Sequence, residues 1–129
     1  MLGWSVKLDK KKILVVEDEE SLLKLENILL TSNGYHAVSA RNGTEALKML
    51  ERENIDLVLL DVMLPDIDGY EVCRRIKADA VMQKIPVLMV TAKNHSDDID
   101  RGGEAGADWY VTKPFKSANM LNAVKRLLP

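Results

Sequence analysis

Short apolar runs alternate along this chain with longer segments of helical period. The runs typical of strands lie at about 12–17, 35–39, 55–60, 86–90 and 107–111. The third run is apolar almost throughout, as in a strand of a parallel sheet that is buried on both faces. Alternation of this kind predicts repeated βα units in an α/β protein with a five-stranded parallel sheet. Short, right-handed connections then favour a doubly wound, three-layer α/β/α sandwich.

Between the runs, apolar residues recur at helical spacing and predict the faces that pack on the sheet. The predicted core positions are Leu22, Leu25, Ile28 and Leu29; Ala46, Leu47 and Leu50; Val72, Cys73 and Ile76; and Met120, Leu121, Val124, Leu127 and Leu128. Asn42 followed by Glu45 resembles a capping box, and Asn33-Gly34 marks the end of the first helix. The fourth helix should be marginal, because Gly102 and Gly103 each cost about 1 kcal/mol relative to alanine.

Polar side chains follow the apolar runs at their carboxyl ends. Glu17 and Asp18 follow the first run, Asp61 the third, Thr91 the fourth and Lys113 the fifth. In an open α/β sheet, ligands bind in the crevice outside the carboxyl ends of the strands, so these side chains should converge there. Three carboxylates in one crevice predict a bound cation. The structural alternatives are a turn acid, acids at the positive amino end of a helix, a strand-end hydroxyl and a surface ion pair.

Composition narrows the class of protein. A chain of 129 residues has the size of one domain, and we expect a solvated lead-in over 1–10 and a domain over 11–129. The net charge of −2 predicts no general attraction for nucleic acid or membrane, so neither is expected as a direct partner. Cys73 is the only cysteine, which excludes an internal disulfide and favours a cytoplasmic setting. His36 and His95 have no neighbour at metal-ligand spacing.

Five segments of the chain, in order and in spacing, resemble the receiver domains of two-component response regulators, chemotaxis regulators among them. They are Val15-Val16-Glu17-Asp18, Leu59-Leu60-Asp61-Val62-Met63-Leu64-Pro65 with Asp68-Gly69, Val90-Thr91-Ala92, Gly106-Ala107-Asp108 with Tyr110, and Lys113-Pro114-Phe115. The resemblance covers about residues 11 to 128. It implies a flavodoxin-like sheet of strand order 2-1-3-4-5. It also implies a signalling protein that catalyses only its own phosphorylation and dephosphorylation, and so is not an enzyme.

The same resemblance implies roles for the residues at the strand ends. Asp61 would be the phospho-acceptor and would take its phosphoryl group from a histidine of a sensor kinase or phosphotransfer protein. Asp18, Asp61 and the backbone carbonyl of Met63 would hold Mg²⁺, with Glu17 acting directly or through water. Mg²⁺ prefers six oxygen ligands and keeps several waters, so two or three protein ligands suffice.

Three further residues complete the implied machinery. Lys113 would neutralise charge at the phosphoryl group, and the Thr91 hydroxyl would bond to a phosphoryl oxygen. We expect a cis bond between Lys113 and Pro114 that aims the lysine into the crevice. Tyr110 would move from exposed to buried and so alter the face of the fourth helix, fifth strand and fifth helix. That face would control a partner protein or output domain, with the chain a monomer or a weak, phosphorylation-dependent dimer.

Other functions are less well supported by the residues. A phosphatase with an aspartyl nucleophile of the haloacid dehalogenase type needs a second acid two residues after the nucleophile, where this chain has Met63. A nucleotide or flavin module needs a glycine- or hydroxyl-rich loop after the first strand, where this chain has acids at 17–20. A free-standing regulator is favoured over the receiver portion of a longer regulator or hybrid kinase, which stays the alternative.

Overall fold

The computed structural model describes residues 10–91 and 96–129 of the chain. The strands are β1 (Lys12–Val16), β2 (His36–Ala40), β3 (Leu57–Asp61), β4 (Val87–Thr91) and β5 (Trp109–Thr112). The helices are α2 (Glu20–Ser32), α3 (Gly43–Arg52), α4 (Gly69–Ala78), α5 (Ser96–Ala105) and α6 (Ser117–Leu127), with a short 3-10 turn, η1 (Met82–Lys84). Residues 1–9 of the expected lead-in and His95 lie outside the described residues. No helix in the described part of the chain combines the length and the apolarity needed to cross a membrane.

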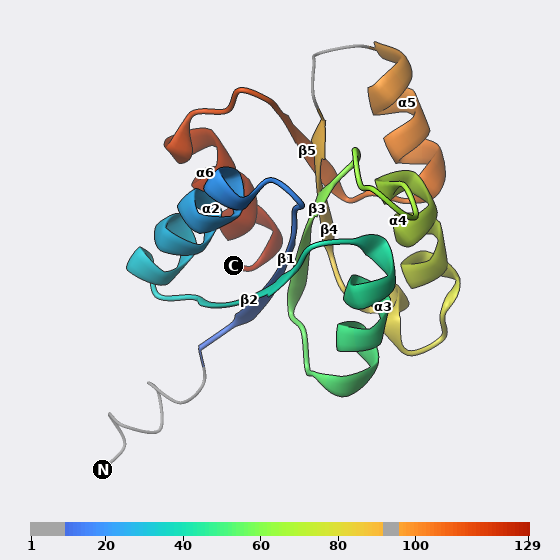
Figure 1. Ribbon diagram of the computed structural model, residues 1–129, viewed down its shortest axis with the longest axis horizontal. Coiled ribbons are helices and arrows are strands. Elements are labelled where there is room, and N and C mark those ends of the chain that lie inside the picture. The colour runs from blue at the N-terminus through green and yellow to red at the C-terminus, as the bar shows by residue number, and fades with distance from the viewer. Residues whose placement is uncertain (1–9, 92–95) are drawn as a thin grey trace.

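The five strands form one parallel sheet in the order β2-β1-β3-β4-β5, which confirms the predicted fold. Figure 1 shows α2 and α6 on one face of the sheet and α3, α4 and α5 on the other, so the molecule has three layers. Because all strands run the same way, their carboxyl ends lie along one edge of the sheet. That edge is where the polar residues of the sequence were expected to meet.

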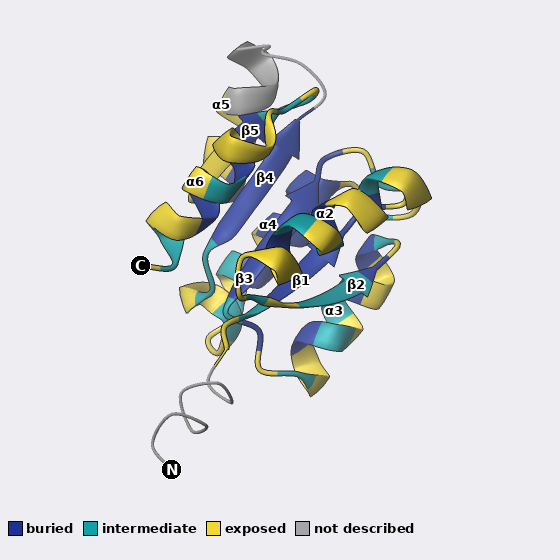
Figure 2. Ribbon diagram, turned by 90° about the vertical axis from the view of Figure 1, so that its left-hand side faces the viewer, coloured by how far each residue is buried: buried dark blue, intermediate teal, exposed yellow. Residues whose placement is uncertain are grey.

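Alternate side chains of each strand enter two separate apolar cores. In β1, Leu14 and Val16 pack in the core under α3 and α4, whereas Ile13 and Val15 pack in the core under α2 and α6. The central strands β3 and β4 are buried along their whole length, and Figure 2 shows them enclosed by the helices. Cys73 lies in the first core, where burial raises the pKa of its thiol to about 11, as an inert structural thiol requires.

Three of the four predicted helix faces are buried as expected, but the prediction for the first helix was wrong in part. Leu25 and Ile28 are exposed, whereas Leu23, Glu26 and Leu30 are the buried residues of α2. Leucines follow one another so closely in this helix that two neighbouring faces both have helical period. Packing on β1 and β2 chooses the face that includes a glutamate, which hydrophobic periodicity cannot anticipate.

The predicted signals at helix ends are present in the structure. The Asn42 side chain accepts a hydrogen bond of 2.8 Å from the backbone N–H of Glu45 at the start of α3. Asn33 is the C-cap of α2, and Gly34 follows with φ of +90°, a conformation that favours glycine. These local bonds satisfy backbone groups that a helix end leaves unpaired.

Gly69 lies at the first position of α4, where the chain turns back against the end of β3. Its N–H donates to the carbonyl of Val62 at 2.9 Å. A Cβ added at this position would lie 2.3 Å from the carbonyl oxygen of Asp61 and 2.7 Å from Cα of Val62. Both contacts are with backbone, which cannot rotate away, so only glycine allows this loop to close beside Asp61.

We predict that Gly69→Ala lowers the free energy of unfolding by at least about 2 kcal/mol, because the methyl group displaces backbone. Gly103→Ala in α5 is the matched control, since a Cβ there meets nothing within 4 Å. That substitution should leave stability unchanged or raise it by up to about 1 kcal/mol. Urea unfolding of the two variants measures the difference, and equal stabilities would contradict the close approach at Gly69.

Candidate functional site

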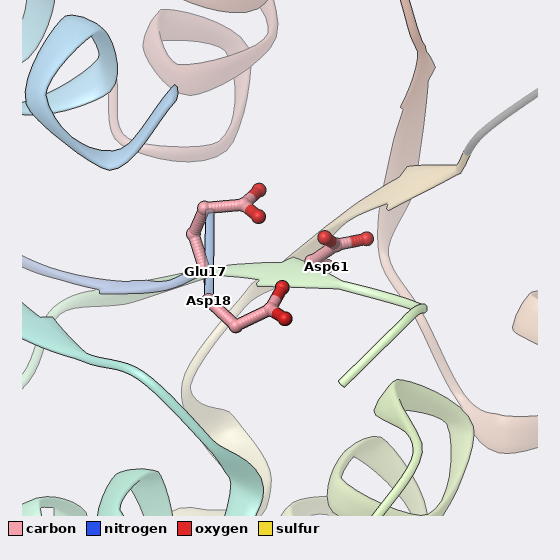
Figure 3. Close-up of side chains that lie close together, drawn as sticks. All are labelled: Glu17, Asp18 and Asp61. Carbon is pink, nitrogen blue, oxygen red and sulfur yellow. The ribbon is translucent and has the colours of Figure 1, made fainter. Parts of the chain in front are cut away.

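Three carboxylates meet at the carboxyl edge of the sheet. Glu17 and Asp18 follow β1 and Asp61 ends β3, and one side-chain oxygen from each lies within 4.8 Å of the others. Figure 3 shows the three side chains gathered beyond the strand ends. Glu17 and Asp61 are buried, whereas Asp18 is exposed. Their mutual repulsion is strongest where water is scarce, so a group of this kind favours a counter-charge.

The sheet ladder fixes the backbone of the strand ends on both sides. Glu17 N–H donates to the carbonyl of Ala40 at 3.0 Å, Val62 N–H to Val90 at 3.0 Å, and Lys113 N–H to Thr91 at 2.6 Å. Each of these bonds continues the pairing one step beyond its strand. The backbone of these polar residues is therefore fixed by hydrogen bonds to the neighbouring strands.

The pleat of the strands decides which way each side chain points. Glu17 has the same parity as Ile13 and Val15, Asp61 as Leu57 and Leu59, and Lys113 as Val111, all of which pack in the α2 and α6 core. Asp18 has the opposite parity and leaves the strand on the other side of the sheet. The buried carboxylates of Glu17 and Asp61 therefore lie on the side of the sheet that α2 covers, and the exposed carboxylate of Asp18 lies on the other side.

Lys113 supplies the counter-charge within the described residues. Its Nζ donates to Oδ2 of Asp61 at 2.9 Å and lies 3.3 Å from Oε1 of Glu17, close enough for an ion pair. The peptide bond between Lys113 and Pro114 is cis, as predicted. Burial alone would lower the pKa of this ammonium, but the hydrogen bond and charge of Asp61, with the charge of Glu17, outweigh burial and raise it.

Glu17 keeps one oxygen without a hydrogen bond. Its Oε2 accepts from the N–H of Glu19 at 3.1 Å, but Oε1 is buried and has no partner of hydrogen-bond geometry in the described structure. Burial, and then the charge of Asp61, raise the pKa of Glu17 to about 7, although the N–H of Glu19 and the charge of Lys113 act in the opposite direction. A buried carboxylate oxygen that has an ion pair with Lys113 but no hydrogen bond can accept a further cation.

The other predicted site residues lie around this centre. Thr91 is buried at the end of β4, next to β3. Met63 donates its N–H to Oδ1 of Asp61 at 3.1 Å and exposes its side chain. Tyr110 lies on β5, three residues before Lys113, with 40% of its surface exposed and its ring stacked on Trp109. The structure thus brings the acids, the lysine and the hydroxyl to one sheet edge and leaves the tyrosine on the outer surface.

Asp66 is a residue near the site whose contacts the sequence did not predict. Its carboxylate accepts from the N–H of Gly43 at 2.8 Å, from the N–H of Thr44 at 2.9 Å, and from the Thr44 hydroxyl. Burial would raise the pKa of Asp66, but the bonds from Thr44, Ile67 and Gly43 outweigh it and hold that pKa well below its usual range. The loop that follows Asp61 is thereby attached to the amino end of α3.

Comparison with known proteins agrees with this geometry. A family model described as the response regulator receiver domain matches residues 13–125. The chain is 48% identical over 118 residues to the alkaline phosphatase synthesis transcriptional regulatory protein PhoP of Bacillus subtilis (strain 168), covering 92% of this chain and 48% of PhoP. It is 40% identical over 119 residues to the DNA-binding response regulator MtrA of Mycobacterium tuberculosis (strain CDC 1551 / Oshkosh), covering 92% of this chain and 51% of MtrA.

A solved structure shares the fold and is described with a bound magnesium ion. The receiver domain of sensor histidine kinase PA1611 from Pseudomonas aeruginosa PAO1 superposes with a TM-score of 0.86 at 31% identity, covering 92% of this chain and 98% of that one. Its description records a magnesium ion coordinated in the active site cleft. The present chain spans about half the length of the curated relatives named above.

The expectation that excluded nucleic acid as a direct partner was wrong for this group of proteins. MtrA is named a DNA-binding response regulator, and PhoP a transcriptional regulatory protein. The expectation rested on a net charge of −2. A charge summed over a chain that covers half of such a protein carries no information on what the other half binds.

We predict that the metal-free protein becomes less stable as pH rises from about 5 to about 8. Burial is the main cause that raises the pKa of Glu17 to about 7 and that of Glu26 to about 8, from 4.5. Between those values the folded state holds protons that the unfolded state has released, so raising the pH favours unfolding. Urea unfolding in EDTA should show a loss of at least about 1 kcal/mol over this interval.

Saturating Mg²⁺ is the control, because a cation beside the carboxylates stabilises their ionised forms and should remove most of that loss. A free energy of unfolding that increases between pH 5 and pH 8 in EDTA would contradict the pKa values given to the two buried glutamates.

Proposed function

This chain belongs to the family of response regulator receiver domains of two-component systems, and from that premise we propose that Asp61 accepts a phosphoryl group from a phosphohistidine of a kinase or phosphotransfer protein. The receiver comprises residues 11–129. One observation carries the proposal: Asp61 lies within 4.8 Å of two further acids and 2.9 Å from the Lys113 ammonium, at the carboxyl edge of the sheet. An acid that served only a turn or a helix end would need neither the two further acids nor the ammonium beside it.

The donor set fits a magnesium ion. Mg²⁺ prefers oxygen ligands and retains several waters, so a few carboxylate and carbonyl oxygens are enough to bind it. Asp18, Asp61 and the backbone carbonyl of Met63 would hold the ion, with Glu17 acting directly or through water. The unbonded Oε1 of Glu17 supports this assignment. When bound, the ion supplies positive charge that offsets the repulsion between a carboxylate and an incoming phosphoryl group.

In the proposed transfer, the protein forms one covalent bond, through Asp61. A carboxylate oxygen of Asp61 forms a bond to phosphorus while the bond from phosphorus to the donor's imidazole nitrogen breaks. The electron pair of the broken bond stays on that nitrogen, which takes up a proton. Lys113 is placed to balance the negative charge that arrives, and the buried Thr91 hydroxyl to donate to a phosphoryl oxygen. Positioning and charge are the main requirements of phosphoryl transfer.

A groove beside the site offers a surface for the phosphoryl donor. It has a volume of about 500 Å³ and is lined by Leu22 and Leu25 of α2 and by Lys113, Pro114 and Phe115. Leu25 and Ile28 are among the largest exposed apolar side chains of the described structure. Grouped apolar residues at the surface indicate an interaction site, and this one adjoins Asp61. We therefore place the donor against α2 and the loop after β5.

The signal leaves the site through β5 and its neighbours. A phosphoryl group brings about two negative charges and should draw the Thr91 hydroxyl inward. Tyr110 lies on the adjacent strand and is exposed, so it can fill the space that this movement opens. Arg101 of α5 lies 4.3 Å above the ring of Tyr70 in α4, and Arg126 of α6 lies 4.4 Å above that of Trp109. Because the rings of Tyr110 and Trp109 are stacked, movement of Tyr110 would disturb the contact between β5 and Arg126 of α6.

The output of the protein is the part of the proposal that depends most on relatives. PhoP and MtrA are named as a transcriptional regulatory protein and a DNA-binding regulator. The identity of 48% to PhoP favours a transcriptional output over the free-standing arrangement expected from the sequence. A receiver of a sensor kinase, as in PA1611, is the second candidate at 31% identity.

We also propose that the protein lies in the cytoplasm, because its Cys73 is a free thiol.

We predict that Asp61→Asn abolishes labelling by acetyl phosphate or a phosphorylated kinase while the protein stays folded. The amide has the shape of the carboxylate but lacks its nucleophilic oxygen. Asp68→Asn is the matched control: Asp68 lies in the same loop, but its side chain caps α4 by accepting from Glu71 N–H at 2.9 Å. The control should be labelled as the wild type is. Labelling of Asp61→Asn at the wild-type level on a Phos-tag gel would exclude Asp61 as the acceptor.

We further predict that beryllofluoride with Mg²⁺ changes the fluorescence of Trp109. This ring is 41% exposed and stacks on Tyr110 at 6.0 Å between centroids, so inward movement of the tyrosine must alter its surroundings. Trp4→Phe removes the second tryptophan of the chain and leaves Trp109 as the reporter. Thr91→Val should abolish the change, since it removes the hydroxyl that starts the movement. An unchanged spectrum, with unchanged amide signals from 105–115, would refute this switch.

A further inference from the structure

Glu26 is a buried acid that the proposed chemistry does not use. It lies on the face of α2 that packs on the sheet, between Leu23 and Leu30, and only 1% of its surface is exposed. Its Oε1 is fully buried and has no hydrogen-bond partner in the part of the chain that the structure describes. The next residue, Asn27, bonds to the Ser39 hydroxyl of β2 at 3.0 Å. This oxygen therefore lies in the core without the hydrogen bond that usually accompanies a buried polar atom.

Such a placement lowers the stability of the fold. An acceptor that loses water and gains no partner is unfavourable, and an ionised one far more so. A leucine at this position would continue the apolar face formed by Leu23 and Leu30. A residue that lowers the stability of the fold and lies on the same side of the sheet as a functional site can be retained for its effect on that site.

The charges that act on Glu26 are those of the phosphorylation site. After burial, the causes that shift its pKa, to about 8, are the charges of Glu17, Lys113, Asp61 and Glu19, in that order. Glu17 comes from the end of β1, Asp61 from β3, Lys113 from the end of β5, and Glu19 from the loop before α2.

β2 and α6 also contribute apolar side chains to this core. The described ones are Ala37, Met120, Leu121, Ala123, Val124 and Leu127. Glu26 thus has the electrostatic surroundings of the phosphorylation site, although its helix position lies two turns beyond Glu19.

We propose that Glu26 is a positioning residue of this site: its carboxyl group, buried on the same side of the sheet as Glu17 and Lys113, becomes ionised when a divalent cation binds and thereby strengthens the binding of that cation. This inference rests on the proposed function, from which it takes the cation site. Glu26 does not touch the ion. It acts through the charge it adds on the α2 side of the sheet, where Glu17, Asp61 and Lys113 all point.

Thermodynamic linkage gives the proposal a measurable consequence. A cation that favours the ionised form of Glu26 releases the proton of that carboxyl to solvent. By reciprocity, the affinity of the protein for the cation must rise as the pH increases through the range in which Glu26 is protonated in the metal-free protein. A lowering of the pKa by one unit corresponds to about a tenfold gain in affinity between the two ends of that range. A glutamine of the same shape cannot contribute to this gain.

The test measures the dissociation constant of Mg²⁺ at pH 6 and pH 9 for the full chain and for Glu26→Gln. The ratio of the two constants reports the effect of the Glu26 charge, because Glu17 and the other acids of the site are present in both proteins. We expect a ratio near one at pH 6 and Glu26→Gln to bind about three- to tenfold more weakly at pH 9. The same ratio at both pH values would overturn the proposal.

Two further variants separate charge from structure. Glu20→Gln removes an acid from the same helix whose side chain is 59% exposed, so its ratio to wild type should stay constant between the two pH values. Glu26→Leu should raise the melting temperature of the metal-free protein by about 3 °C or more and bind Mg²⁺ as weakly at pH 9 as Glu26→Gln does. A lower melting temperature would show that the carboxyl group has a structural partner, and would overturn the proposal.

The outcome for the wild type distinguishes this inference from the function on which it rests. A wild-type chain that binds no Mg²⁺ at either pH overturns the proposed cation site and this inference with it. A wild type that binds Mg²⁺ and takes up phosphate, with Glu26→Gln equal to it at both pH values, leaves the proposed function standing and removes only Glu26 from the site.

Discussion

Repulsion among carboxylates at one edge of the sheet is the constraint on which the rest of this structure depends. Glu17, Asp18 and Asp61 place oxygens within 4.8 Å of one another, and two of these side chains are buried. Lys113 lies between the two buried acids and relieves part of the repulsion. Burial, and then the charge of Asp61, still raise the pKa of Glu17, whose Oε1 has no hydrogen bond in the described structure. A group of acids that repel one another is stabilised by added positive charge, which is the electrostatic basis of the proposed cation site.

A rigid support is what allows such a site to exist. The strand ends are paired one step beyond the sheet, Gly69 brings α4 against the backbone of Asp61, and Asp66 fastens the intervening loop to α3. Two apolar cores hold the strands between the helices, so that the energy lost to buried charge is offset by packing at other places. Loss of any of these contacts would let the acids move apart. The affinity for a cation would then fall as the distance between the carboxylates increased.

Most of the fold and the centre of the site followed from the sequence, for a physical reason. Buried parallel strands are apolar throughout, so Asp61, Thr91 and Lys113 stand out where those runs end, and strand topology alone brings them together. The face of α2 could not be predicted, because Leu22, Leu23, Leu25, Leu29 and Leu30 supply two faces of helical period. The role of Asp66 could not be predicted either, since its partner Thr44 lies 22 residues earlier. The roles assigned to the site residues stay predictions until they are measured.

The position of β5 explains how one domain can join chemistry to recognition. As the last strand of the order β2-β1-β3-β4-β5, it has a strand neighbour on one side only within the described sheet, so Trp109 and Tyr110 reach the surface. Three residues later the same segment delivers Lys113 to Asp61, across the end of β4 and past Thr91. In the proposed switch, a change of charge at Asp61 would act on β5 through Lys113, which follows the strand, and through the Thr91 hydroxyl at the end of β4. The proposed output face therefore needs no separate relay, because the segment that senses the acceptor carries the aromatic side chains that a partner would contact.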